Sequence, residues 1–229
     1  MTNIAIIPAR GGSKRIPRKN IKEFCGKPII AYSIEAAIKS NIFDEIMVST
    51  DDDEIAEISK SYGAKVPFYR SKELSSDMAM TVPVLIEVLG EYEKLDKHFD
   101  ITCCIYPCAP FITPQKLEQG MNLLLQSGAN FAFPIVKFSY PPQRCLVIRE
   151  QRVSMLYPEN YLKRSQDLEP LYHDAGQFYF AKTKVLKEKQ TVFGENSMPI
   201  ICNESEIQDI DTIEDWKIAE IKYNLLYSK

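Results

Sequence analysis

The chain has 229 residues, a net charge of −3 at neutral pH, and 45% hydrophobic and 26% charged residues, values typical of a globular protein. This acidic balance disfavours nucleic-acid binding, which calls for a broad basic face. An apolar run precedes the first charges, the reverse of a secretory signal, and no apolar stretch approaches 18 residues. We therefore expect one α/β domain over residues 1–229, with an accessory lobe and no membrane segment.

The cysteines predict a reducing compartment. None of the six belongs to a Cys-x-x-Cys pair, and Cys103 and Cys104 lie inside an apolar run. They resemble small buried hydrophobes rather than disulfide or zinc ligands. We expect a cytoplasmic protein.

A loop near the N-terminus predicts an anion site. Residues 4–7 form an apolar run typical of a buried parallel strand, and Gly11 and Gly12 follow it. Glycine allows successive backbone N–H groups to turn toward one phosphate, and Ser13 can donate another hydrogen bond. Residues 10–27 carry a net charge of +6, whereas the rest of the chain sums to −9. A local cationic loop of this kind suits a nucleoside triphosphate, although a solvated basic surface loop is the alternative.

The hydrophobic periodicity predicts alternating strands and helices. Strands are expected at residues 4–7, 45–49, 65–69, 101–106, 131–136 and 177–181. Helices are expected at residues 28–40, from 55, from 81, at 114–126 and from 212 to the C-terminal end. Asp52 and Asp53 are interpreted as helix caps, and Asp51 either as a cap or as a ligand. The turn with Pro107 and Pro110 is either a pocket wall or only a turn.

The α/β alternation stops between residues 137 and 171. A segment that long without regular rhythm is seldom a simple loop. We expect an inserted hairpin lobe that serves self-association or covers the site.

Asp209 and Asp211 form a second chemical centre. They alternate along an extended segment and so point the same way, with Ile210 toward the core. Two carboxylates on one face favour a cation between them, and Mg²⁺ beside a triphosphate is the candidate. Alternatively, one of them caps the last helix or pairs with a lysine.

Several motifs resemble those of the CMP-sialic acid synthetase family, cytidylyltransferases that act on nonulosonic acids. They are PARGGSK at 8–14, IP at 16–17, KN at 19–20, STD at 49–51, ELSSD at 73–77, the Pro107/Pro110 turn and DIDT at 209–212. The resemblance spans nearly the whole chain. It implies a three-layer α/β/α Rossmann-like nucleotidyltransferase fold with a mostly parallel sheet and a small inserted dimerisation lobe at about 137–171.

The resemblance also implies roles for individual residues. Nucleotide binding falls to Ala9, Arg10, Gly11, Gly12, Ser13, Lys14, Lys19, Asn20, Asp77 and Thr81. Sugar binding falls to Tyr106, Gln143, Arg144, Arg164, Gln166, Asp174 and Gln177. Asp209 and Asp211 would hold Mg²⁺, and Arg10, Lys19 and Asp211 would act in catalysis. The expected partners are CTP, a nonulosonic acid and a second copy of the chain, with Arg144 or Arg164 reaching the sugar carboxylate across the dimer.

Within the family, the segments at 106–111 and 174–179 are most similar to the pseudaminic acid branch. The expected reaction joins CTP and pseudaminic acid to give CMP-pseudaminic acid and pyrophosphate. Sialic or legionaminic acid, and less readily the eight-carbon lipopolysaccharide acid, are the alternative substrates. A non-catalytic CTP sensor is the alternative of another class.

Overall fold

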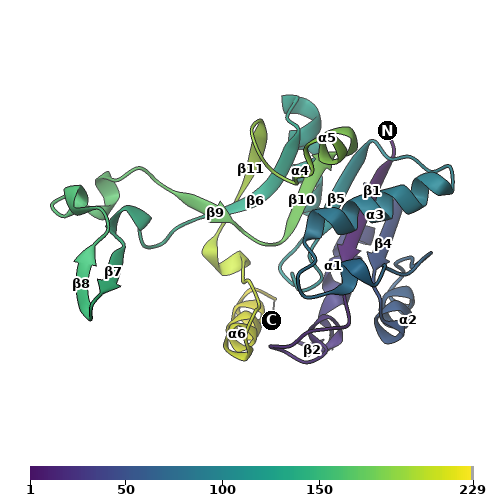
Figure 1. The fold of residues 1–229 in the computed structure, drawn as a ribbon, viewed down its shortest axis with the longest axis horizontal. Coiled ribbons are helices and arrows are strands. Elements are labelled where there is room, and N and C mark those ends of the chain that lie inside the picture. The colour runs from purple at the N-terminus through teal and green to yellow at the C-terminus, as the bar shows by residue number, and fades with distance from the viewer. Residues whose placement is uncertain (228–229) are drawn as a thin grey trace.

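The computed structural model describes residues 1–227, and its centre is a seven-stranded mixed sheet (Figure 1). The spatial order is β11-β6-β10-β5-β1-β4, with β9 pairing with β6 beside this path. The strands are β1 (Asn3–Pro8), β4 (Glu45–Ser49), β5 (Ile101–Ile105), β6 (Phe131–Lys137), β9 (Tyr172–Asp174), β10 (Phe178–Lys182) and β11 (Ser197–Cys202). Two small sheets lie outside it, β2 (Glu23–Phe24) with β3 (Lys27–Pro28), and β7 (Leu146–Arg149) with β8 (Arg152–Met155).

Most strands of the sheet run in one direction. β1 pairs in parallel with both β4 and β5, and β6 pairs in parallel with β11. β10 lies antiparallel between β5 and β6, so β6 runs the same way as β5. The carboxyl ends of β1, β4 and β5 consequently meet at one edge, where open α/β sheets commonly bind ligands.

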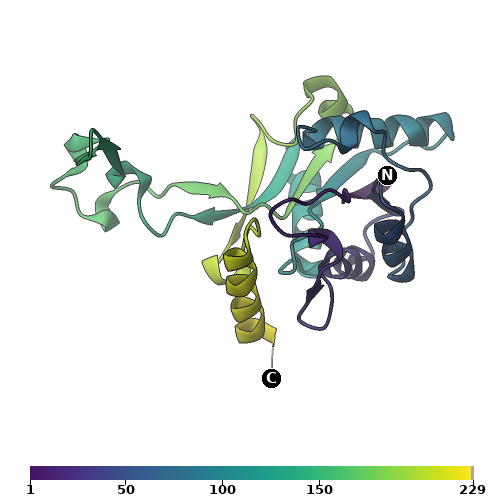
Figure 2. The same ribbon diagram turned by 60° about the horizontal axis from the view of Figure 1, so that its bottom comes forward.

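Helices cover both faces of this sheet, which confirms the predicted three-layer α/β/α arrangement (Figures 1 and 2). The helices are α1 (Ile29–Ser40), α2 (Asp53–Ser61), α3 (Thr81–Lys94), α4 (Pro114–Ser127), α5 (Thr183–Lys189) and α6 (Ile213–Tyr227). α1 and α4 contact each other on one face, and α3 contacts β1 while α5 contacts β10. None of the helices in residues 1–227 combines the length and apolarity needed to cross a membrane.

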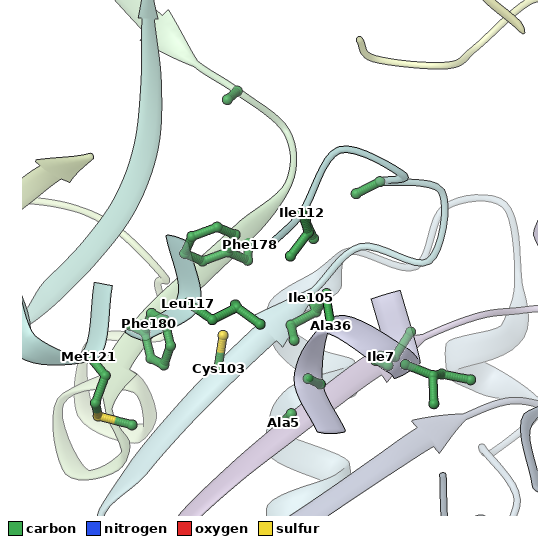
Figure 3. Close-up of a cluster of buried hydrophobic side chains, with 14 of the residues drawn as sticks. Ala5, Ile7, Ala36, Cys103, Ile105, Ile112, Leu117, Met121, Phe178 and Phe180 are labelled. Carbon is green, nitrogen blue, oxygen red and sulfur yellow. The ribbon is translucent and has the colours of Figure 1, made fainter. Parts of the chain in front are cut away.

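The sheet separates the hydrophobic core into two clusters, and successive residues of β1 point alternately into one and the other. Ala5 and Ile7 of β1 pack on the α1 and α4 side with Phe178 and Phe180 of β10, as Figure 3 shows. The alternate residues Ile4 and Ile6 belong to the opposite cluster, which includes α3. Since both sets are fully buried, β1 is apolar at almost every position, as a strand covered on two faces must be.

A third apolar cluster holds the C-terminal helix against the N-terminal loop. Trp216 of α6 packs edge-on against Phe24, with ring centroids 5.5 Å apart, and Ile16 and Ile210 are buried in the same cluster. Asp215 N donates to Thr212 Oγ1 at 3.2 Å, which confirms the predicted cap of this helix. The cluster thereby brings residues 209–211 beside the cationic loop.

The prediction of a strand over residues 65–69 is wrong. Only Lys65 pairs with β4, through Lys65 N to Ile46 O and Val48 N to Lys65 O, both at 2.9 Å. Pro67 has no N–H with which to extend that ladder, so the chain leaves the edge there. β9, β11 and α5 are elements that the periodicity did not predict.

Residues 137–171 extend away from the sheet and carry the β7–β8 hairpin at their far end (Figures 1 and 2). The register pairs Leu146 with Met155 and Ile148 with Val153, so these four side chains share one face of the hairpin. Leu146, Ile148 and Val153 are exposed in the single chain.

Candidate active site

A cavity of about 520 Å³ opens at the carboxyl edge of β1 and β5. The sequence-predicted residues that line it are Arg10, Gly12, Ser13, Lys14, Lys19, Asn20, Asp77, Thr81, Tyr106, Asp209 and Asp211. They come from the N-terminal loop, the loop before α3 and the first residue of that helix, the end of β5 and the segment before α6. Folding therefore gathers the two chemical centres expected from the sequence into one pocket.

Arg10 and Lys14 share a carboxylate at the cavity wall. Both form ion pairs with Asp77, and hydrogen bonds from Lys14 and Arg10 hold the pKa of the Asp77 carboxyl below its ordinary value. Asp77 is one of the predicted nucleotide-binding residues, and in the structure it pairs with two cations of the loop. Both cations are at least partly exposed to the cavity and are placed to exchange this carboxylate for phosphate oxygens.

Lys19 and Asn20 connect the loop to its surroundings. Lys19 Nζ donates to Ile210 O at 2.6 Å and lies 3.6 Å from Asp211. Asn20 is buried, and its Nδ2 donates to Arg10 O at 2.9 Å. The amide of Asn20 thereby ties the end of the loop to its beginning, while the ammonium of Lys19 lies between loop and carboxylates.

Asp209 and Asp211 face the cavity while Ile210 is buried between them. Burial, and then the charge of Asp211, raises the pKa of the Asp209 carboxyl. Asp211 also accepts a hydrogen bond from Arg15 at 2.8 Å. A carboxylate pair in which the charge of one member disfavours ionisation of the other is a donor set that a divalent cation relieves, so these residues fit Mg²⁺. Within residues 1–227, no group of three or more His, Cys, Asp or Glu side chains is arranged to hold a metal ion.

Arg70 is a cavity residue that sequence reasoning missed. Its side chain is buried and donates to Ser49 Oγ at 3.0 Å and to Ser49 O at 2.5 Å, at the end of β4. Burial lowers the pKa of this guanidinium. The sequence gives little indication of this role. An arginine that follows a short, irregular segment has the same sequence pattern whether its side chain is buried or exposed.

Tyr179 of β10 lies behind the lining residue Tyr106 and does not itself line the cavity. Its hydroxyl donates to Asp174 Oδ1 at 2.9 Å, and its ring lies 5.5 Å from that of Tyr106. Burial raises the pKa of both phenols, so both are neutral donors at ordinary pH. Asp174 and Gln177 do not line the cavity; Gln177 is buried and donates instead to Glu206 O at 2.8 Å. Gly176 takes the wall position between them.

Six other predicted residues also lie outside the cavity. Ala9 is buried, and Gly11 N donates to Asp51 Oδ1 at 2.9 Å, so they position the loop rather than line the pocket. The other four belong to the projecting lobe: Gln143, Arg144, Arg164 and Gln166. Arg164 forms a local ion pair with Asp167 at 2.7 Å. Within one chain these side chains do not reach the pocket.

Comparison with known proteins identifies the family. A family model described as cytidylyltransferase matches residues 4–213. The chain is 43% identical to the pseudaminic acid cytidylyltransferase of Campylobacter jejuni over 98% of this chain and 97% of that protein. It is 35% identical to the CMP-N,N'-diacetyllegionaminic acid synthase of Legionella pneumophila, over 96% and 95%.

The fold has a counterpart among solved structures. A CMP:2-keto-3-deoxy-manno-octonic acid synthetase complexed with CTP superimposes with a TM-score of 0.72 over the full length of both chains, at 18% identity. This likeness supports the nucleotidyltransferase fold. Together with the match over residues 4–213 and the relatives of similar length, it leads to one conclusion: the chain belongs to the cytidylyltransferase family.

Proposed function

We propose that this protein joins CTP and pseudaminic acid to form CMP-pseudaminic acid and pyrophosphate. The observation that carries the proposal is one cavity lined both by the cations Arg10, Lys14 and Lys19 and by the carboxylates Asp209 and Asp211. Identity of 43% to a pseudaminic acid cytidylyltransferase over nearly the whole chain supports the choice of substrates.

The reaction is an in-line displacement at the α-phosphorus of CTP. The anomeric hydroxyl oxygen of the sugar forms the new O–P bond, the bond from the α-phosphorus to the bridging oxygen breaks, and pyrophosphate leaves with that bonding pair. The hydroxyl proton passes to solvent. The chain positions the triphosphate, and Arg10, Lys14 and Lys19 neutralise charge that grows on the α-phosphate and the leaving group.

Asp209 and Asp211 are the residues that would hold Mg²⁺. The ion, when bound, would neutralise phosphate charge and favour ionisation of the attacking hydroxyl. Asp211 also pairs with Arg15 and Lys19, and these two cations of the loop hold its carboxylate at the cavity wall.

The proposal assigns the cytosine and ribose to Asn20 and Thr81, which both line the cavity. The sugar belongs toward Tyr106 and Gly176, where the neutral phenol of Tyr106 can donate to a sugar oxygen. The proposal also locates the protein in the cytoplasm, where CTP would be its substrate.

A homodimer completes the proposal. Three of the four side chains on the apolar face of the β7–β8 hairpin are exposed within residues 1–227, with Ile148 exposing 76% of its surface. An isolated two-stranded hairpin is marginally stable in water, so a second copy is the expected cover. Pairing through the lobe is the route by which Gln143, Arg144, Arg164 and Gln166 would reach the sugar of the other protomer's site.

Light scattering tests the dimer. The wild type is expected at twice the chain mass, and a variant with Leu146→Ser and Ile148→Ser is expected at the chain mass. A wild type that remains at the chain mass at micromolar concentration contradicts the dimer.

Mixing two impaired variants tests whether the site is shared between chains. Arg10→Ala damages the cavity and Arg144→Ala damages the lobe, so a mixed dimer would hold one site with both parts intact. Turnover of the mixture above that of either variant alone is the expected result. Turnover equal to the average of the two variants would place each site within a single chain.

Pyrophosphate release tests the reaction. CTP and Mg²⁺ are offered with pseudaminic, legionaminic or sialic acid in separate assays, and ATP, GTP and UTP serve as nucleotide controls. Release with CTP and pseudaminic acid alone is expected. Release with legionaminic acid instead would favour the second candidate, which the 35% identity to the Legionella synthase supports. Binding of CTP without any release would indicate a nucleotide sensor.

A further inference from the structure

Among the cations of residues 10–19, Arg18 alone lies outside the cavity lining. Arg10, Lys14, Arg15 and Lys19 line the pocket, but Arg18 does not. Its guanidinium turns to the start of α2, where two acidic side chains receive it. Arg18 therefore has a role different from that of its neighbours in the same basic run.

The contact is a bidentate ion pair. Arg18 Nη1 donates to Asp52 Oδ2 at 2.5 Å, and Nη2 donates to Asp52 Oδ1 at 2.8 Å. Nη2 also reaches Glu54 Oε2 at 2.5 Å. Parallel hydrogen bonds between a planar guanidinium and a carboxylate fix orientation as well as distance. The pair consequently holds Arg18 in one position relative to α2.

Asp52 is itself immobilised and touches the other arm of the loop. Its Oδ1 caps α2 by accepting from Ile55 N at 3.0 Å. A Cβ on Gly11 would lie 2.6 Å from Asp52 Oδ2, so only glycine permits this approach. The neighbouring Asp51 accepts from Gly11 N at 2.9 Å. Both arms of the loop, at Gly11 and at Arg18, are therefore attached to the same turn after β4.

The backbone conformation of Arg18 explains why its side chain and that of Lys19 point in different directions. Arg18 adopts the left-handed conformation, with φ 55° and ψ 31°. This conformation is unfavourable for a residue that carries a Cβ. It sends the side chain of Arg18 toward α2, while Lys19 and Asn20, in the next turn, enter the cavity. The ion pair with Asp52 offsets the cost of this turn.

We infer that Arg18 is a positioning residue for CTP. By clamping the loop to Asp52 and Glu54, it holds Arg10, Lys14 and Lys19 where they face the triphosphate. It does not contact the nucleotide. The inference rests on the proposed function, because it assumes that the cavity binds CTP.

Four variants and one control test the clamp. Arg18→Gln removes the charge, and Arg18→Gly removes the side chain while relieving the left-handed backbone. Asp52→Asn keeps an oxygen that can cap α2 but removes the ionic partner, and Arg18→Lys keeps the charge without the fork. Lys187→Gln is the matched control, because Lys187 also forms a 2.5 Å ion pair between elements, with Glu93, outside the cavity.

The primary measurement is the dissociation constant of CTP by titration calorimetry. Arg18→Gln, Arg18→Gly and Asp52→Asn are each expected to weaken CTP by roughly tenfold or more, because small displacements of positioning groups are costly. Arg18→Lys is expected between these and the wild type, and Lys187→Gln within about twofold of the wild type. In steady-state assays the KM for CTP should rise while the KM for the sugar stays unchanged, a split that general destabilisation would not produce.

Several results would overturn the inference. Wild-type affinity for CTP in Arg18→Gln would show that the clamp is unnecessary. Recovery of affinity in Arg18→Gly alone would assign the effect to the backbone rather than the ion pair. A rise in both KM values together would indicate a structural role. A wild type that binds no CTP would refute the proposed function itself, and the inference with it.

Discussion

The Asp52 carboxylate should make the stability of the fold depend on pH. Hydrogen bonds from Arg18 lower the pKa of this carboxyl from 3.8 to about 2 in the folded protein. A group whose pKa is depressed by folding stabilises the fold above its unfolded pKa. That stabilisation is complete above about pH 5 and is lost as the pH falls through about 2. Replacement of Asp52 by asparagine should therefore destabilise the protein at neutral pH and much less in acid.

The magnitude follows from the same shift. A difference of about 1.8 pKa units corresponds to roughly 2.4 kcal/mol at neutral pH. Arg18 exposes 38% of its side chain, so solvent screening reduces this value to about 1–2 kcal/mol. At pH 3 the unfolded carboxyl is mostly protonated, and about half of the contribution remains. The asparagine of the variant can still cap α2, so the difference reports the charge rather than the cap.

Urea unfolding monitored by circular dichroism at pH 7 and pH 3 measures this difference. The wild type should exceed Asp52→Asn by about 1–2 kcal/mol at pH 7 and by about half of that at pH 3. Asp96→Asn is the control, because the Asp96 side chain is fully exposed, and should show no such change. An equal difference at both pH values would refute the reasoning, since a pH-independent loss cannot come from the ionised carboxylate.

Three further outcomes are expected. Arg10→Ala should lower kcat/KM by about 10²–10³-fold, or roughly 2–4 kcal/mol, as when one preorganised donor is deleted; unchanged turnover would remove the loop from the mechanism. Asp211→Asn should require more Mg²⁺ for half-maximal pyrophosphate release, while its melting temperature stays near that of the wild type. An unaltered Mg²⁺ response would contradict the proposal that Asp209 and Asp211 hold the ion. Gly120→Ala should destabilise the fold by about 1–3 kcal/mol in urea, because the new Cβ would lie 2.8 Å from the ring of Phe180; full stability would mean that this ring can move.

Several parts of the fold could be predicted because their signals are local. The buried run at β1, the apolar periodicity of α1 and the cap of α6 by Thr212 each depend on residues within one or two turns of the chain. The direction of β10 could not be predicted, since it is decided by pairing with β5 and β6 from other parts of the chain. The absence of a strand at 65–69 could not be predicted for the same reason, because it depends on pairing with β4, and only Lys65 in that segment pairs with it.

The candidate site divides in the same way. The glycine pair, the cations and the paired aspartates follow from residue type and spacing. Their convergence on one cavity depends on Trp216 and Ile210 packing with Ile16 and Phe24, which are distant in sequence. Arg70 lines the cavity because its guanidinium is held by Ser49 at the end of β4, a contact between distant parts of the fold.

By itself, the sequence determined that this protein is an α/β chain with a cationic phosphate loop and a carboxylate pair, since periodicity and residue chemistry are read within short segments. Only the tertiary structure decided which cations serve the cavity. Lys19 and Arg18 are adjacent and both positive, yet one enters the pocket and the other clamps the loop to α2. The left-handed turn at Arg18 and the carboxylates that receive it separate the two, and those carboxylates come from a strand-to-helix junction more than thirty residues away along the chain.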